Sequence, residues 1–127
     1  MNYLLDTHVL IWFLNGDKLL SIKARKAIES DDAINFVSIA SLWEIAIKLS
    51  LARLEIKFPF EAISKEFEKN NFQLLPIIFN DTLMLSSLTL HHRDPFDRIL
   101  ICQSITNDFT LISKDKEFAG YKIKLLW

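Results

Sequence analysis

Short apolar segments that alternate with helical segments constrain the fold of this 127-residue chain more than any other feature. Segments of strand character lie at NYLL (2–5), AINFV (33–37), FQLLPI (72–77) and FTLIS (109–113), and an edge-like strand is predicted at 123–126. Between them, apolar residues recur at helical spacing. Strands that alternate with helices in this way predict an α/β fold. We expect a three-layer α/β/α sandwich around a central, mainly parallel sheet of four to five strands.

The predicted helices occupy 7–14, 20–30, 39–51, 59–70, 80–90 and 95–108. Ser21 is a candidate N-cap for the second helix, and Asn80 or Asp81 for the fifth. The helix at 39–51 is apolar almost all round, which is typical of a buried helix. Cys102 lies in the apolar run ILIC and is expected in the core.

Length and composition favour one small domain, residues 1–127, and exclude several function classes. With two glycines the chain has no Gly-rich phosphate loop, so nucleotide-binding loops of that kind are excluded. A net charge of −1 argues against binding nucleic acid by charge alone. One cysteine allows no internal disulfide, and no basic segment precedes the N-terminal apolar run. We therefore expect a cytoplasmic protein that makes no use of the membrane.

Two carboxylates follow predicted strands directly. Asp6 comes after the first strand, and Asp115 lies just past the fourth. In open α/β sheets the ligand crevice lies at the carboxyl ends of the strands, where the strand order reverses. Two carboxylates at that edge would repel each other unless a cation lay between them, so the pair indicates a cation site.

Glu44 is the only acid in the apolar segment 39–51. Burial of an unpaired carboxylate costs at least about 2 kcal/mol, so Glu44 needs a partner. Three interpretations remain open from these residues. Ser41 and Glu44 fit a capping box, Lys48 one turn later could form a salt bridge, or a metal ion could be bound.

The stretch HRDPFDR (92–98) supplies two further acids. Asp94 before Pro95 fits an N-cap followed by proline in the first helical turn. Asp97 then takes the third helical position, where the helix dipole favours a carboxylate. Taken alone, the stretch is typical of a helix start. Together with Asp6, Glu44 and Asp115 it predicts an all-oxygen site, which suits Mg²⁺ or Mn²⁺ better than zinc.

The elements LLDTHVLIW, VSIASLWEIAIK, HHRDPFDRILICQS, TLISKDKEF and IKLLW, in this order, resemble the PIN-domain ribonucleases, and specifically the VapC-like toxins of bacterial toxin–antitoxin pairs. The resemblance covers essentially the whole chain. It implies a PIN-like fold in which Asp6, Glu44, Asp97 and Asp115 converge, hold Mg²⁺ or Mn²⁺ and position the water that attacks an RNA phosphodiester. It also implies a homodimer and a small antitoxin protein as partner.

Supporting roles follow from the same resemblance and from the neighbouring residues. Asp94 is expected as a helix cap or as a residue behind the ligands. Thr7 is expected to orient Asp6 or a water, and Ser113 keeps a hydroxyl where the family often has threonine. Arg98 is a candidate substrate contact, although an internal salt bridge would look identical in sequence. Other cations, Lys48, Arg93, Lys114 and Lys116, flank the acids and could receive RNA phosphates or balance charge.

Histidines and aromatic residues allow further interpretations. A histidine could act as a general base, but His8 is expected to pack on the first helix, with His91 and His92 on a surface turn. The aromatic residues exceed what one small core needs, so some are expected at a protein interface; they are Trp12, Phe13, Trp43, Phe58, Phe60 and Phe67.

Three functions are compatible with these patterns. The leading hypothesis is a metal-dependent endoribonuclease that acts as a toxin. A phosphatase of the haloacid-dehalogenase type would need a second aspartate two residues after Asp6, where this chain has His8. A non-catalytic binding module with the same fold is the third. No motif encodes which RNA sequence would be cut.

Overall fold

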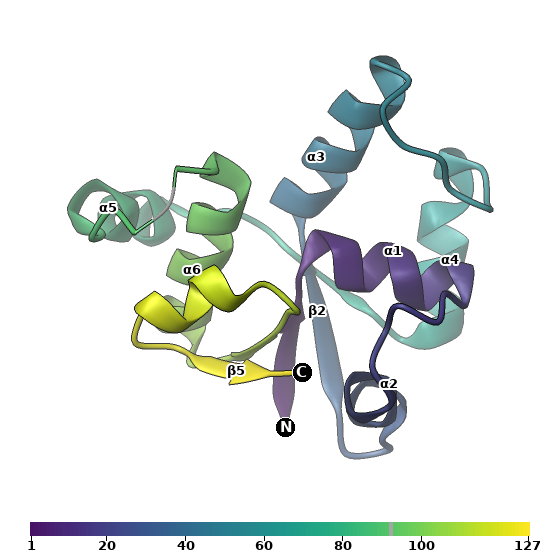
Figure 1. Cartoon of the computed structure of the whole chain (residues 1–127), viewed down its shortest axis with the longest axis horizontal. Helices are drawn as coiled ribbons and strands as arrows, with labels where there is room; N and C mark the ends of the chain where they lie inside the picture. Colours follow the sequence, from purple (N-terminus) through teal and green to yellow (C-terminus); the bar gives the residue numbers. More distant parts are fainter. Residues whose placement is uncertain (92) are drawn as a thin grey trace.

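The predicted strands form one five-stranded sheet in the computed structural model, which describes residues 1–91 and 93–127. The strands are β1 (Asn2–Leu5), β2 (Ile34–Ser38), β3 (Gln73–Leu75), β4 (Thr110–Ile112) and β5 (Lys124–Leu126). Their order is β3-β2-β1-β4-β5, and every pairing between neighbours is parallel. The chain thus moves outward from β1 on one side and returns to its other side at β4, so the order reverses between β1 and β4 (Figure 1).

The helices lie at the predicted places. They are α1 (Thr7–Asn15), α2 (Ile22–Glu29), α3 (Ile39–Ser50), α4 (Ile63–Asn70), α5 (Phe79–Ser87) and α6 (Pro95–Asn107), with short 3₁₀ turns η1 (Phe60–Ala62) and η2 (Lys116–Gly120). None of the helices in the described part of the chain is long and apolar enough to cross a bilayer. The interpretation of His92 as part of a surface turn lies outside the described residues.

Alternating side chains along the strands build a core on each face of the sheet. Tyr3 and Leu5 of β1 face a cluster to which α1, α2 and α4 contribute, whereas Leu4 faces a cluster with α6. In Figure 1, α5 and α6 accordingly lie on one side of the sheet and α1, α2 and α4 on the other. The three-layer α/β/α sandwich is confirmed.

Helix caps show which local predictions were right. Ser21 caps α2, since its hydroxyl accepts the backbone N–H of Ala24 at 3.0 Å. The N-cap predicted at Asn80 or Asp81 is wrong, because α5 begins at Phe79 after Ile78. Asp81 lies inside the first turn, where its Oδ2 accepts the N–H of Ile78 at 2.9 Å. A carboxylate can satisfy a helix start from within the first turn, which the sequence pattern does not distinguish from an N-cap.

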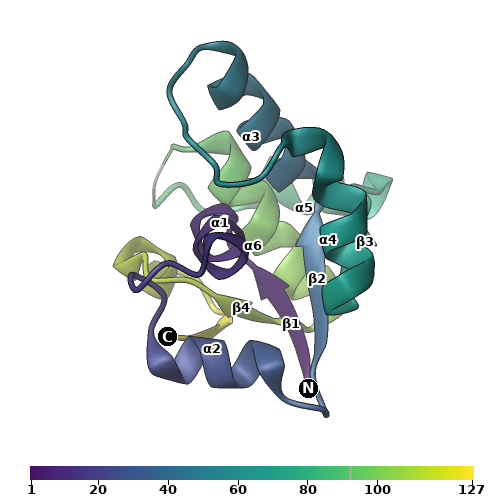
Figure 2. The same ribbon diagram turned by 90° about the vertical axis from the view of Figure 1, so that its right-hand side faces the viewer.

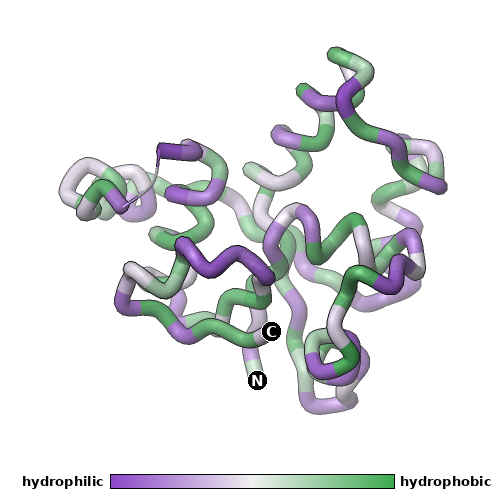
Figure 3. Tube along the Cα trace, viewed as in Figure 1, coloured by the Kyte–Doolittle hydropathy of each residue, from purple (hydrophilic) through white to green (hydrophobic). Residues whose placement is uncertain are grey.

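Helix α3 is less buried than predicted. It stands beyond the carboxyl edge of the sheet in both ribbon views, where it packs against α1 and α6 (Figures 1 and 2). Glu44 and Ile45 are buried, but Trp43 is 60% exposed and Leu51 55%. Hydrophobic and hydrophilic residues alternate along this helix in Figure 3. The prediction of a buried helix is wrong for the side that carries Trp43, which stays exposed to solvent.

The aromatic residues pack better than their number suggested. Trp12, Phe13 and Phe60 pack against the core cluster that contains Phe67. Trp43 contacts the edge of Phe96, with ring centroids 5.2 Å apart, and stays exposed. The expectation that some of these aromatics lie at a protein interface stays a prediction, and Trp43 is the most exposed of them. Cys102 is fully buried, which confirms its place in the core.

A strained residue follows the end of α3. Ala52 has φ 53°, a left-handed conformation that glycine adopts without steric cost. We expect Ala52→Gly to stabilise the fold by about 0.5–1 kcal/mol, because relief of the strain exceeds the added freedom of the unfolded chain. Urea unfolding at equilibrium measures this change. Gly16 provides the reverse substitution as a control. Its φ is 65°, and an added Cβ would meet no atom within 4 Å, so Gly16→Ala should destabilise the fold through backbone strain by a similar amount. Equal stability of Ala52→Gly and the parent would contradict the strain.

Candidate functional site

The site begins at the carboxyl edge of the sheet, where β1 and β4 end side by side. Asp6 follows Leu5, the last residue of β1, and its N–H donates to the carbonyl oxygen of Ile112, the last residue of β4. Ser113 and Asp115 follow Ile112 at the same edge. Because the strand order reverses between β1 and β4, this edge is the place where parallel α/β sheets form ligand crevices.

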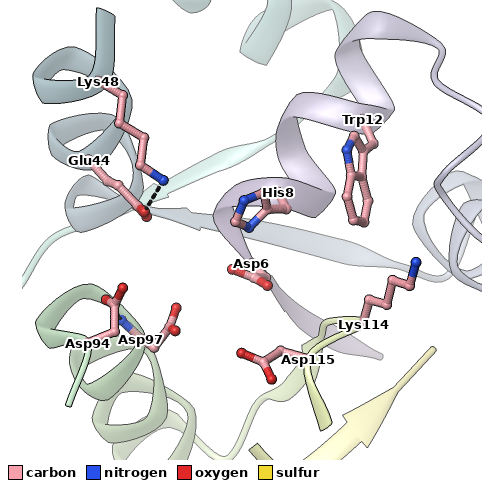
Figure 4. Close-up of a pocket in the computed structure, with 9 residues that line it drawn as sticks. All are labelled: Asp6, His8, Trp12, Glu44, Lys48, Asp94, Asp97, Lys114 and Asp115. Atoms are coloured by element: carbon pink, nitrogen blue, oxygen red, sulfur yellow. Dashed lines mark hydrogen bonds and ion pairs between the residues drawn. The ribbon is translucent and has the colours of Figure 1, made fainter. Parts of the chain in front are cut away.

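Five predicted acids line one cavity of about 320 Å³ at this edge (Figure 4). Asp6 lies near its centre, with Glu44 of α3, Asp94 and Asp97 at the start of α6, and Asp115 around it. The remaining lining residues are His8, Trp12, Lys48 and Lys114. Acids that are up to 109 positions apart in the sequence therefore meet because their elements end at one edge.

Ser113 links the two acids that follow strands. Its hydroxyl donates to Oδ2 of Asp6 at 2.8 Å and accepts the backbone N–H of Asp115 at 3.0 Å. Oδ1 of Asp115 in turn accepts the N–H of Glu117 at 2.9 Å and caps η2. Ser113 is 4% exposed, so this buried hydroxyl holds the Asp6 carboxylate and the Asp115 backbone in fixed relation.

Thr7 supports the site differently from the expected way. Its hydroxyl donates to the Ser41 hydroxyl at 2.9 Å, not to the carboxylate of Asp6. Both side chains are buried, and the bond ties the first residue of α1 to α3. Thr7 thus fixes the helix that carries Glu44 relative to the strand end that carries Asp6.

Glu44 forms a salt bridge with Lys48, as one of its three interpretations predicted. Lys48 Nζ lies 2.8 Å from Glu44 Oε2. The capping-box interpretation is wrong: α3 begins earlier, and its N-cap is Ser38, whose hydroxyl accepts the N–H of Ala40 at 3.0 Å. Glu44 is buried and Lys48 partly exposed, so the carboxylate faces the cavity with one cation beside it.

The start of α6 has the predicted geometry. Oδ1 of Asp94 accepts the N–H groups of Phe96 and Asp97 at 2.9 and 3.0 Å, so Asp94 is the N-cap. Asp94 also lines the cavity. Arg98 does not line it: its guanidinium donates to the carbonyl oxygens of Leu88 and Thr89 and to the Tyr121 hydroxyl, at 3.2–3.4 Å. Arg98 therefore braces the segment that leads into α6.

The pKa of Asp97 is raised to about 8. Burial is the largest cause, followed by the charges of Asp6, Asp94, Glu44 and Asp115. Burial also raises the pKa of Asp6, against the hydrogen bond from Ser113, which lowers it. The cavity thus concentrates more negative charge than its own cations neutralise.

The donor set suits a hard divalent cation. Asp6, Glu44, Asp97 and Asp115 offer only carboxylate oxygens, the ligands that Mg²⁺ and Mn²⁺ prefer. Among the described residues, no three acidic, histidine or cysteine side chains lie close enough together to enclose an ion in this conformation. The carboxylates therefore line an open cavity, and a cation would have to draw them inward.

Two lining residues were not predicted as part of the site. His8 and Trp12 lie one turn apart on α1 with ring centroids 5.8 Å apart, so His8 packs on the first helix as expected and also faces the cavity. Their four-residue spacing, just after Asp6, was the available signal. Lys48 and Lys114, which were expected to flank the acids, also line the cavity.

A five-stranded parallel sheet with acids gathered at its carboxyl edge defines the class of protein. The family model of the PIN domain matches residues 3–124, so the chain belongs to the PIN-domain family. The resemblance inferred from the sequence motifs is confirmed.

Particular relatives carry the comparison further. Over 121 residues the chain is 25% identical to "Ribonuclease VapC22" of Mycobacterium tuberculosis, covering 94% of this chain and 91% of the relative. Its fold is similar to that of a chain in the crystal structure of VapBC2 from Rickettsia felis bound to a DNA fragment from their promoter, with TM-score 0.73, 13% identity and coverage of 99% and 98%. A toxin–antitoxin complex from Klebsiella pneumoniae has TM-score 0.67, 19% identity and coverage of 98% and 96%.

Proposed function

We propose that this chain is a metal-dependent endoribonuclease and the toxin of a type II toxin–antitoxin pair. One observation carries the proposal: five carboxylates line a single cavity at the point where the strand order reverses. The name of the relative "Ribonuclease VapC22" supports RNA as the substrate. The phosphatase alternative has no support here, because the residue two positions after Asp6 is His8.

Asp6, Glu44, Asp97 and Asp115 would hold Mg²⁺ or Mn²⁺. When bound, such an ion lowers the pKa of water and neutralises the charge of a phosphodiester. The fit rests on charge: burial, with the neighbouring acids, raises the pKa of Asp97 to about 8, and a bound cation would favour its ionised form.

Other residues of the chain position these ligands. Ser113 holds the carboxylate of Asp6 through its hydroxyl, and Asp94 starts the helix that aims Asp97 at the cavity. The ammonium group of Lys48 lies 2.8 Å from Glu44 and would compete with a metal ion for this carboxylate. Because Lys48 lines the cavity, its ammonium group, once released from Glu44, would be available to an RNA phosphate oxygen. Asp6, Glu44, Asp97 and Asp115 would orient the attacking water against the scissile phosphate.

The proposal also covers the binding partner, the oligomeric state and the cellular location of the protein. We propose a small antitoxin protein as the partner, because one structural neighbour comes from a toxin–antitoxin complex and the other from a structure of VapBC2. A homodimer, a single domain over residues 1–127 and a cytoplasmic location remain predictions from the sequence. Gel filtration with light scattering would measure the oligomeric state.

Removal of metal tests the function directly. We expect purified protein to cleave single-stranded RNA in Mg²⁺ or Mn²⁺ and to lose at least about 100-fold of its rate in EDTA, since loss even of groups behind a metal costs 10–100-fold. Readdition of Mg²⁺ should restore the rate. Cleavage that persists undiminished in EDTA would refute the metal dependence. Intact RNA under all metal conditions, together with calorimetric binding of Mg²⁺, would favour a non-catalytic binding module instead.

A further inference from the structure

The cavity has two chemically different walls. Glu44, Asp94 and Asp97 lie on one side of Asp6, whereas Trp12 and Lys114 lie on the other (Figure 4). The acids on the first side suit a cation and the phosphate that it neutralises. They account for neither the indole ring nor the ammonium group on the second side.

Trp12 lines the cavity and is held there by contacts with two other rings. It is half-buried, and its ring packs against Trp127, with centroids 5.8 Å apart and planes inclined by 58°. On the neighbouring helical turn, the ring of the exposed His8 lies 5.8 Å away, inclined by 41°. Contacts with two rings restrict the rotation of the indole, so its orientation is set before any ligand arrives.

An aromatic ring beside a phosphodiester-cleaving centre has a specific use with RNA. Unpaired bases stack on aromatic side chains, and such stacking is tolerant of sequence because every base has a flat π-face. Exposed Lys114 lies on the same side of the cavity and can receive a neighbouring phosphate. Paired bases in a duplex have no free face to offer.

On the basis of the function proposed above, we propose that Trp12 is the stacking platform for an unpaired nucleobase next to the cleaved phosphodiester, with Lys114 as its phosphate contact. RNA would run across the cavity from the acidic wall to the Trp12 wall. The subsite selects single-stranded over double-stranded RNA and accepts any base.

Substitution of Trp12 tests the platform against a matched control. Trp12→Leu should lower kcat/KM on a single-stranded RNA oligonucleotide by about 5- to 150-fold, the range for loss of one base stack. Trp43→Leu should change it by less than about twofold, because Trp43 is 60% exposed on α3 and does not line the cavity. Trp12→Phe keeps an aromatic face and should retain most of the activity, which separates stacking from loss of fold.

An abasic RNA makes the test independent of protein stability. In an oligonucleotide that the parent cleaves, one abasic residue beside the cleaved bond should slow the parent by the same factor as Trp12→Leu. The variant should be insensitive to that abasic residue, because the two changes remove one contact. Independent, multiplicative effects of the two changes would overturn the platform.

Fluorescence distinguishes the occupants of the subsite. RNA added to an Asp97→Asn chain, which leaves the RNA intact, should quench tryptophan emission, and additional Trp12→Leu should remove that quenching. Quenching by an arginine-rich peptide but not by RNA would overturn the proposal in favour of a protein ligand. If the parent neither cleaves nor binds RNA, the proposed function itself fails. Normal cleavage with an unaffected Trp12→Leu variant refutes the platform alone.

Discussion

An Asp97→Asn variant is expected to be more stable than the parent at pH 8 without metal, and almost inactive. Burial and the charges of neighbouring acids raise the pKa of Asp97 from about 3.8 to about 8. Between these values the folded chain retains a proton that the unfolded chain has released. The stability that this group contributes is therefore lost as the pH rises from about 4 to about 8. Asparagine carries no charge at any of these pH values, so the Asp97→Asn variant does not lose this stability as the pH rises.

Thermal unfolding in EDTA at pH 5 and pH 8 measures this effect. The melting temperature of the parent should fall between the two pH values by more than that of Asp97→Asn. Asp108→Asn serves as the control, since Asp108 is exposed and pairs with Lys124 at the surface. Excess Mg²⁺ at pH 8 should raise the melting temperature of the parent more than that of the variant. A variant no more stable than the parent at pH 8 would show that the pKa of Asp97 is not raised in the folded chain.

The activity of Asp97→Asn should move in the opposite direction. Loss of a proposed metal ligand should lower RNA cleavage at saturating Mg²⁺ by at least about 100-fold, on the scale known for groups around metal sites. A gain in stability combined with a loss of cleavage would identify Asp97 as a residue retained for function at the expense of the fold.

An Asp6→Asn variant is expected to lose both metal binding and RNA cleavage. Asp6 is 5% exposed and lies at the centre of the cavity, where its Oδ2 accepts the hydrogen bond from Ser113. Asparagine has nearly the same shape, so the fold should persist while the negative charge is removed. Cleavage should fall by at least about 100-fold, and calorimetry should show weaker binding of Mn²⁺.

Glu117→Gln provides the comparison for Asp6→Asn. Glu117 is exposed, two residues beyond Asp115, and does not line the cavity. The substitution removes the same charge close to the site and should leave cleavage nearly unchanged. Equal rates for Asp6→Asn and the parent would mean that the proposed metal site is wrong.

The sheet and the gathering of the acids were predictable from local patterns. Apolar strands that end at Asp6 and shortly before Asp115 place both acids at one edge, because parallel strands share the direction of their carboxyl ends. The Asp94-Pro95 sequence is a local signal for a helix start, and Asp94 does cap α6. Glu44 required more, because three interpretations fitted its neighbours equally well.

Side-chain partners were harder to predict than elements. The Thr7 hydroxyl bonds Ser41, 34 positions away, and the Arg98 guanidinium bonds carbonyl oxygens of residues 88 and 89. Both hydrogen bonds depend on how separate segments of the chain pack together, and residue spacing along one helix carries no information about that packing. Asp81 shows the same limit at short range, since its carboxylate caps α5 from within the first turn.

By itself, the sequence determined the order of strands and helices, the parallel sheet and the acids that gather at its edge, because periodicity and strand ends are local properties of the chain. Only the tertiary structure decided which side of each helix faces the cavity. That choice brought His8 and Trp12 to the acids and turned Arg98 away. It depends on packing between distant elements, and the raised pKa of Asp97 arises from the same convergence.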